Sequence, residues 1–262
     1  MQKYGQHFLV NKGIIDKIAC AVIDNTHGAL VEIGPGKGAL TAALLERGVN
    51  NFTLVEIDGK MIDTLQKTLP PYAQLDIIEA DFLKLDTNKL PDGDITFVSN
   101  LPYISAAEIL LKVLDMPGFK SAIFMFQREQ AVRLTARPGA RQYGALSVIF
   151  QAFARAKSLC RVSPGSFSPP PKVDSEVLLI TPVEKKFFTS EKHKADFKEL
   201  VKTAFAYRRK TVLNALTEVY GKNKDSLARI LNTSGIKISS RAEELPAAKY
   251  AELAKHLEGF IF

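Results

Sequence analysis

Apolar residues near the start of the chain follow a helical spacing, and further on they form short runs that alternate with helical stretches. The spacing from Ile14 to Val22 predicts a helix over residues 14–23, with Asn11 as its N-cap. Alternating strands and helices predict an α/β fold with a parallel sheet covered on both faces. The predicted elements are the strands Ala29–Ile33, Asn51–Ile57, Leu75–Ala80, Asp94–Ser99 and Ser121–Phe126, and the helices Ala39–Glu46 and Gly59–Leu69.

This pattern changes near residue 183. Gly165–Pro171 is a proline-rich break, Glu176–Ile180 predicts one more strand, and no strand is predicted after Pro182. The remaining predicted helices span residues 195–219, 224–234 and 247–257. We therefore expect an α/β domain over residues 1–183 and a small all-helical domain over residues 184–262.

Composition indicates a folded protein. Of the 262 residues, 46% are apolar, which is enough for a full core. No apolar run has membrane-spanning length, and the first residues lack a signal-type apolar segment, so we expect a cytoplasmic protein. We also expect a monomer. Cys20 and Cys160 are far apart, and the four histidines have no metal-ligand spacing. We therefore expect reduced cysteines and no metal site.

The net charge of +7 is concentrated in the last third of the chain. Residues 184–262 hold 16 basic and 10 acidic residues, whereas residues 1–183 hold 19 and 18. A basic segment on a near-neutral body suits a polyanion bound beside a separate active site, although a solvated lysine-rich surface gives the same count. Arg208, Arg209 and Lys210, in a predicted helix, are the strongest candidates for phosphate contacts.

Candidate ligand-binding residues end three successive predicted strands. Gly34, Gly36 and Gly38 follow the first strand, where glycines let the backbone approach a ligand and a helix N-terminus supplies free N–H groups. Glu56 ends the second strand and is suited to accept hydrogen bonds from ribose hydroxyls. Asp81 ends the third and is suited to accept a hydrogen bond from an adenine amino group. Each feature alone also fits an ordinary turn, but together they favour an adenosyl ligand.

The segment Asn100-Leu101-Pro102-Tyr103 follows the fourth predicted strand at the same sheet edge. An adenine amine is a poor nucleophile because its lone pair is delocalised into the ring. Hydrogen bonds from its two N–H groups to the Asn100 side-chain oxygen and the Leu101 carbonyl would favour a pyramidal nitrogen. Tyr103 offers a face on which an extruded base can stack. An Asn-x-Pro turn with a surface tyrosine is the plain alternative.

Phe167 is a candidate for stacking on the opposite face of the same base. It lies within the proline-rich break, where a phenylalanine can equally pin a loop onto the core.

A series of short motifs runs almost the whole length of the chain. In this order and spacing they resemble the ribosomal RNA adenine N6,N6-dimethyltransferases, specifically the small-subunit (16S) dimethyladenosine transferases. The motifs are Tyr4-Gly5-Gln6-His7-Phe8-Leu9, Val31-Glu32-Ile33-Gly34-Pro35-Gly36, Val55-Glu56-Ile57-Asp58, Asn100-Leu101-Pro102-Tyr103, Gln142-Tyr143-Gly144-Ala145-Leu146-Ser147-Val148, Phe167-Ser168-Pro169-Pro170-Pro171-Lys172-Val173-Asp174-Ser175, Arg208-Arg209-Lys210-Thr211 and Arg241-Ala242-Glu243-Glu244-Leu245.

This resemblance implies a Rossmann-like class I methyltransferase domain, S-adenosylmethionine as cofactor and a helical RNA-binding domain. It implies dimethylation of two adjacent adenines near the 3′ end of 16S ribosomal RNA during small-subunit assembly. By matching motifs, cofactor binding falls to His7, Leu9, Gly34, Gly36, Glu56, Asp81 and Asn100. The adenine pocket falls to Asn100, Leu101, Tyr103 and Phe167.

Three other functions remain as alternatives. One is a large-subunit adenine dimethylase of the antibiotic-resistance type, which the proline-rich segment and the Arg-Arg-Lys-Thr motif resemble less. A DNA adenine methylase shares the Asn-x-Pro-Tyr chemistry but normally carries a larger recognition domain. The third is an RNA-binding assembly checkpoint whose methylation is incidental.

Overall fold

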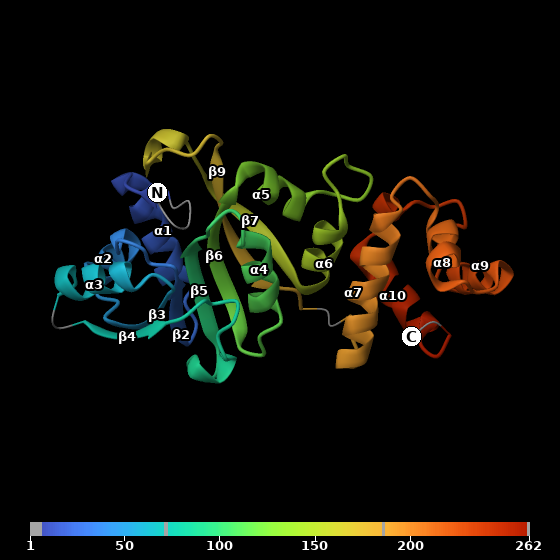
Figure 1. Cartoon of the computed structure of the whole chain (residues 1–262), viewed down its shortest axis with the longest axis horizontal. Coiled ribbons are helices and arrows are strands. Elements are labelled where there is room, and N and C mark those ends of the chain that lie inside the picture. Colours follow the sequence, from blue (N-terminus) through green and yellow to red (C-terminus); the bar gives the residue numbers. More distant parts are fainter. Residues whose placement is uncertain (1–6, 71–72, 185–186, 261–262) are drawn as a thin grey trace. The chain divides into compact units, whose positions relative to one another are not determined.

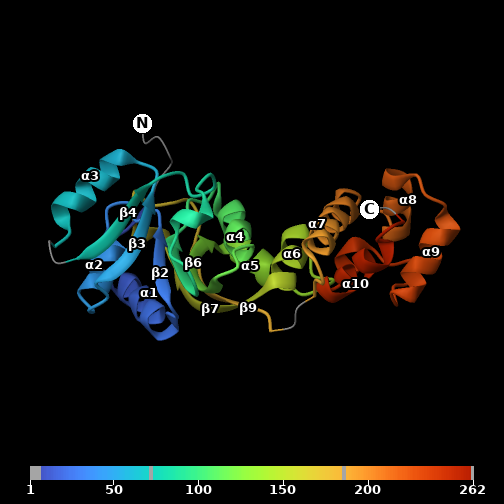
Figure 2. The same ribbon diagram turned by 90° about the horizontal axis from the view of Figure 1, so that it is seen from below.

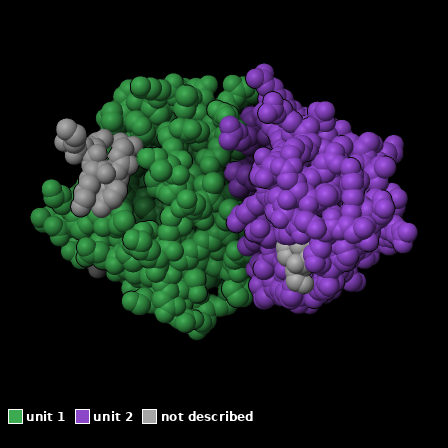
Figure 3. Space-filling model, turned by 45° about the vertical axis from the view of Figure 1, so that its right-hand side comes forward, with its two compact units in different colours: residues 1–131, 156–182 green, residues 132–155, 183–262 purple. Residues whose placement is uncertain are grey.

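A computed structural model of the chain describes residues 7–70, 73–184 and 187–260. The chain divides into two compact units, coloured separately in Figure 3. Unit 1 comprises residues 1–131 and 156–182, and unit 2 comprises residues 132–155 and 183–262. Residues 132–155, which the sequence analysis assigns to the first domain, therefore belong to the second unit, while the later boundary falls at residues 182–183.

Unit 1 is built on a seven-stranded sheet in the order β4-β3-β2-β5-β6-β9-β7 (Figure 1). The neighbours from β4 to β6 are parallel, as predicted, whereas β9 runs antiparallel to β6. A separate two-stranded sheet pairs β1 (Phe8–Leu9) with β8 (Phe167–Ser168). The strands of the large sheet are β2 (Ala29–Ile33), β3 (Asn51–Glu56), β4 (Gln74–Glu79), β5 (Ile95–Asn100), β6 (Phe119–Gln127), β7 (Ala154–Val162) and β9 (Ser175–Pro182).

Helices cover both faces of this sheet. The helices α2 and α3 lead outward from β2 to β4, whereas α4 leads in the other direction from β5 to β6. Because crossovers between parallel strands are right-handed, the two directions place these helices on opposite faces. The helices that begin in unit 1 are α1 (Lys12–Asn25), α2 (Ala39–Leu45), α3 (Gly59–Thr68), α4 (Ala106–Leu114) and α5 (Arg128–Thr135), the last of which continues into unit 2.

The side chain of Asn11 caps α1 as predicted, accepting a hydrogen bond from the backbone N–H of Ile14 at 3.2 Å. Ile15, Ile18 and Val22 of this helix are buried in a cluster with Val98 of β5. The apolar spacing seen in the sequence is therefore the face that packs on the sheet.

Unit 2 is helical in the described residues beyond Pro182 apart from short 3₁₀ turns, with one isolated bridge between Thr211 and Arg241. Its largest buried polar side chains are Tyr143 and Tyr250, whose hydroxyls donate to the carbonyls of Leu245 and Ala242 at 3.0 Å. Burial raises the pKa of Tyr143 to about 12. Figure 2 shows the helices, which are α6 (Ala145–Phe153), α7 (Glu191–Ala206), α8 (Val212–Tyr220), α9 (Lys224–Thr233) and α10 (Ala247–Leu257).

The prediction of one helix over residues 195–219 is wrong. The chain leaves α7 after Ala206 and begins α8 at Val212, so Arg208, Arg209 and Lys210 lie in a turn. Thr211 starts the second helix because its side chain accepts from the backbone N–H of Asn214 at 3.3 Å. The basic cluster is thus presented by a loop and not by a helix face.

None of the helices in the described part of the chain is long and apolar enough to cross a membrane.

Candidate active site

The turn between β2 and α2 requires glycine at three positions. Gly34, Gly36 and Gly38 have φ values of 65°, 56° and 78°, which L side chains rarely adopt. A Cβ on Gly36 would lie 3.0 Å from the ring of Phe8, and one on Gly38 would lie 2.6 Å from Leu65. The turn therefore presents bare backbone to the space beside it.

Glu56 anchors this turn from the end of β3. Its side chain is 2% exposed, and Oε2 accepts a hydrogen bond from the backbone N–H of Gly36 at 3.0 Å. The other oxygen, Oε1, accepts from the N–H groups of Ile57 and Asp58 at 2.9 and 3.0 Å. Since a carboxylate has about four lone-pair sites, roughly one remains, on Oε2. One further hydrogen-bond donor can be accepted there without displacing a backbone donor.

Glu32, which the sequence analysis did not select, is a second buried carboxyl in this region. It is 3% exposed, and its Oε2 accepts a hydrogen bond from the hydroxyl of Thr41 at 2.8 Å. Burial raises its pKa to about 7, and the charge of Glu56 adds to the shift, while the Thr41 hydrogen bond opposes it. An acidic residue inside an otherwise apolar strand was the available signal, since Val31 and Ile33 flank it.

We expect Glu32→Gln to stabilise the fold at alkaline pH. The folded-state pKa of about 7 lies above the ordinary value of 4.5, so wild-type stability falls as pH rises through this interval. The amide has no proton to lose and still accepts from Thr41. The variant should match wild type near pH 4.5 and gain on the order of 1–3 kcal/mol at pH 8 in urea unfolding. Glu46→Gln, at an exposed carboxylate, is the control; an equal gain there would contradict the assignment to Glu32.

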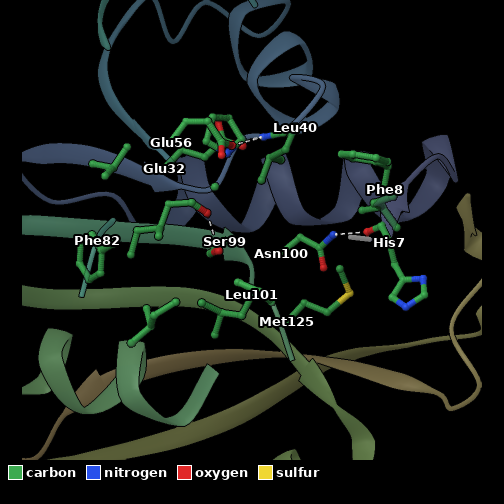
Figure 4. A pocket seen from close by; sticks show the side chains of 18 of the residues that line it. His7, Phe8, Glu32, Leu40, Glu56, Phe82, Ser99, Asn100, Leu101 and Met125 are labelled. Carbon is green, nitrogen blue, oxygen red and sulfur yellow. Dashed lines mark hydrogen bonds between the residues drawn. The ribbon is translucent and has the colours of Figure 1, made fainter. Parts of the chain in front are cut away.

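Asn100 ends β5 with its amide held in one orientation. Its Nδ2 group donates to the backbone carbonyl of His7 at 3.0 Å, which leaves Oδ1 as the acceptor on the other side (Figure 4). The neighbouring Ser99 hydroxyl donates to the carbonyl of Ile33 at 2.6 Å and ties β5 to β2. The N-terminal segment therefore decides which atom of this amide can meet a ligand.

The aromatic rings of Tyr103 and His7 lie near each other in the site. The hydroxyl of Tyr103 shares a hydrogen bond with Ser175 at 2.7 Å, and burial raises its pKa. Its ring centroid lies 5.8 Å from that of His7, with the planes tilted by 31°. The His7 ring is in turn held by the carbonyl of Pro169, 2.8 Å from Nδ1. The tyrosine ring is thus fixed by contacts from two distant segments.

A cavity of about 660 Å³ brings most of the predicted residues together, a size in the range of small-molecule sites. Asp81 is on its wall, and its Oδ1 already accepts from the N–H of Leu83 at 3.0 Å. The predicted site residues that line the cavity are His7, Leu9, Gly34, Gly36, Glu56, Asp81, Asn100, Leu101 and Tyr103.

Phe167 is placed differently. It is 4% exposed and packs in the core cluster, paired with Leu9 across the β1–β8 ladder. The cavity wall includes the next residue, Ser168, but not Phe167. In this structure the ring holds the proline-rich segment to the core.

The first three residues of the N-terminal motif, Tyr4-Gly5-Gln6, lie outside the described residues. Among the residues that are described, no group of three or more His, Cys, Asp or Glu side chains is arranged to hold a metal ion.

The sheet order, with glycine turn and carboxylates at the carboxyl ends of its strands, defines a class I methyltransferase fold. Residues 1–258 match the ribosomal RNA adenine dimethylase family, and the chain belongs to that family.

Curated relatives of this family are similar over nearly the whole chain. A ribosomal RNA small subunit methyltransferase A from Alkaliphilus oremlandii is 38% identical over 260 residues, covering 97% of this chain and 90% of that protein. One from Xanthomonas campestris is 38% identical over 252 residues, covering 95% and 93%.

Solved structures agree. A dimethyladenosine transferase from Plasmodium falciparum superposes with a TM-score of 0.80 at 28% identity, covering 97% of this chain and 98% of that one. The 23S rRNA methyltransferase ErmE shares the fold, with a TM-score of 0.70 at 23% identity over 96% of this chain and 99% of its own.

Proposed function

We propose that this chain transfers methyl groups from S-adenosylmethionine to N6 of two adjacent adenines near the 3′ end of small-subunit ribosomal RNA, giving N6,N6-dimethyladenosine. One observation carries this function. The Asn100 amide, oriented by the His7 carbonyl, leaves Oδ1 as its acceptor in the cavity that Glu56 and Asp81 also line. The names of the small-subunit methyltransferase relatives and of the Plasmodium dimethyladenosine transferase support the substrate and the product.

The cavity fits the adenosyl cofactor. The three glycines of the turn have positive φ values and leave backbone without side chains beside the cavity, and Glu56 retains an acceptor site for a ribose hydroxyl. Asp81 and Phe82 line the cavity and are proposed to meet the adenine ring, and His7 and Leu9 line the same cavity. When bound, the cofactor supplies a methyl group on a positively charged sulfur.

The residues of the Asn100 segment act on the target amine. The Asn100 Oδ1 atom and the Leu101 carbonyl would accept hydrogen bonds from the two N–H groups of the target amine. The lone pair of the amine nitrogen would then point toward the methyl group to be transferred. Held in this way, the nitrogen would take up the methyl group that the bound cofactor supplies, the donor would be left as its neutral thioether, and one N–H proton would leave to water. No general base is needed before the transfer.

Base stacking falls to Tyr103, whose ring lines the cavity. Stacking on aromatic rings contributes about 1–3 kcal/mol per base, which offsets much of the cost of extruding the adenine. Phe167 remains a proposed second stacking ring. It is buried against Leu9, so this role requires the β8 segment to open when RNA binds.

RNA binding is assigned to the turn that follows α7. Arg208 pairs with Glu243 at 3.5 Å and donates to the Arg141 carbonyl at 3.2 Å, and Lys210 pairs with Glu218. Within the described residues, the exposed Arg209 has no ion pair. Arg209 is therefore the cation of this cluster that is open to a phosphate without breaking an existing pair.

Replacing Arg208, Arg209 and Lys210 together with glutamine should weaken RNA binding and flatten its salt dependence. Each lost phosphate contact changes the slope of log affinity against log salt by about 0.7–0.9. We expect Arg209→Gln alone to give the largest single change, because Arg208 and Lys210 have carboxylate partners. Filter binding from 50 to 300 mM salt, roughly the range in which such slopes are resolved, measures the effect. Lys224→Gln, at the exposed start of α9, serves as a control, and an unchanged slope in the triple variant would mean that the turn faces solvent only.

Methyl transfer to purified small subunits, large subunits and DNA tests the proposal as a whole. Labelled N6,N6-dimethyladenosine should form only on small-subunit RNA. Labelling of the large subunit would favour the antibiotic-resistance type of enzyme. Binding to precursor subunits without methylation would favour an assembly checkpoint. We place the action in the cytoplasm on assembling subunits and treat the enzyme as a monomer.

A further inference from the structure

Met125 is the residue that neighbours Asn100 on the adjacent strand. The register of the parallel strands β5 and β6 pairs Asn100 with Met125, and that of β6 and β9 pairs Met125 with Val177. Paired residues on adjacent strands point to the same face, and the strands lie about 4.8 Å apart. Met125 is 1% exposed and lines the cavity, as do Asn100 and Val177.

The two ends of the Asn100 amide meet different surroundings. The Nδ2 end faces the His7 carbonyl, to which it donates. Figure 4 shows the thioether end of Met125 beneath the amide, on the side of Oδ1. A ligand group that donates a hydrogen bond to Oδ1 would therefore lie beside the flexible apolar side chain of Met125. Ile123 and Val177 line the same cavity.

A second methyl transfer requires space and apolar contact beside Oδ1 of Asn100, which a single transfer does not. After the first methyl group is attached, the amine keeps one N–H, and the methyl takes the direction of the other. A methyl group aimed at a buried acceptor forfeits a hydrogen bond and needs apolar contact instead. Methionine is unbranched and has three rotatable bonds beyond its backbone, so it can shift to make room where a stiffer side chain cannot.

We propose that Met125 determines the product of this enzyme. Its side chain provides the room and the apolar contact that the first methyl group needs beside Oδ1 of Asn100, so that a monomethylated adenine binds productively for the second transfer. The second transfer then repeats the bond changes of the first, with a fresh donor and with the last N–H proton leaving to water. This inference rests on the proposed function.

The test compares adenosine with N6-methyladenosine at the target position of the same RNA. Single-turnover rates on the two substrates give the ratio of second to first transfer, and nucleoside mass spectrometry gives the products. One methyl group in an apolar pocket is worth roughly 10–200-fold, so Met125→Phe should lower this ratio at least tenfold and accumulate monomethyladenosine. Met116→Leu, at a methionine that does not line the cavity, should keep the wild-type ratio.

A second variant covers the event that Met125→Phe does not fold. Met125→Ala enlarges the same space, so it should methylate an N6-ethyladenosine target roughly tenfold or more faster than wild type does. A wild-type ratio in folded Met125→Phe, or no gain on the ethyl substrate in folded Met125→Ala, overturns the role of Met125. Wild-type enzyme that makes no dimethyladenosine on any RNA contradicts the proposed function instead, which separates the two failures.

Discussion

Asn100→Ala is expected to lower the single-turnover rate of methyl transfer by roughly 10²- to 10³-fold, the usual cost of removing one preorganised polar group from a reacting atom. The structure explains why this amide should matter so much. Its orientation is fixed before substrate arrives, since Nδ2 is already bonded to the His7 carbonyl. Only Oδ1 is left for the amine, and alanine offers no replacement.

The affinity for the cofactor should change little in this variant, because in the proposed mechanism the main partner of Asn100 is the reacting amine. Rapid-quench measurements with saturating RNA and cofactor give the chemical step, and calorimetry gives the affinity. Asn88→Ala, at an exposed position, is the matched control. A wild-type rate in folded Asn100→Ala would exclude the proposed mechanism.

Glu56→Ala should weaken cofactor binding by roughly 10- to 100-fold, since a hydrogen bond to a charged group is worth about 1.5–3 kcal/mol. Two losses combine in this variant. The ribose loses its acceptor, and the N–H of Gly36 loses the Oε2 atom that holds the glycine turn in place.

Glu56→Gln separates these two losses. The amide keeps the volume and one oxygen, which can hold the N–H groups of Ile57 and Asp58. Its NH₂ group then faces the N–H of Gly36 and cannot accept from it. We therefore expect a cofactor affinity between those of the wild type and of Glu56→Ala. Calorimetry on all three proteins measures this order, with Glu46→Ala as the surface control. Unchanged affinity in folded Glu56→Ala would remove this residue from the site.

Much of the sheet was predictable because its strands are continuous apolar runs. Ala29–Ile33 was predicted to the residue, and five further strands lie within one or two residues of their predicted bounds. The strand β7 was missed because it lies at the sheet edge and interleaves polar residues, including Arg155, Lys157 and Arg161. A half-exposed edge strand gives too weak an apolar signal.

Contacts between distant segments explain the remaining differences. No glycine or proline in the sequence marks the end of α7 after Ala206. The turn that follows is stabilised by the β-bridge between Thr211 and Arg241. The burial of Phe167 depends on β1, more than 150 residues earlier in the chain. Likewise, sequence could propose Asn100 from local chemistry but not the His7 carbonyl that orients it. Glu32 was overlooked because its effect comes from burial, which a strand pattern only partly reveals.

The pairing of β1 with β8 has a consequence for the order in which the enzyme matures. It joins Leu9 to Phe167, and the loop that it closes encloses nearly the whole α/β unit. Closing so long a loop costs chain entropy before any contact compensates for it, so this pairing belongs to the slow, late steps of folding. During synthesis the strand that carries Asn100 emerges well before residue 167 does. If the proposed mechanism holds, the Asn100 amide would reach its working orientation only once β8 has paired with β1, and a nascent chain that stops short of β8 would hold the proposed cofactor residues without an oriented amide.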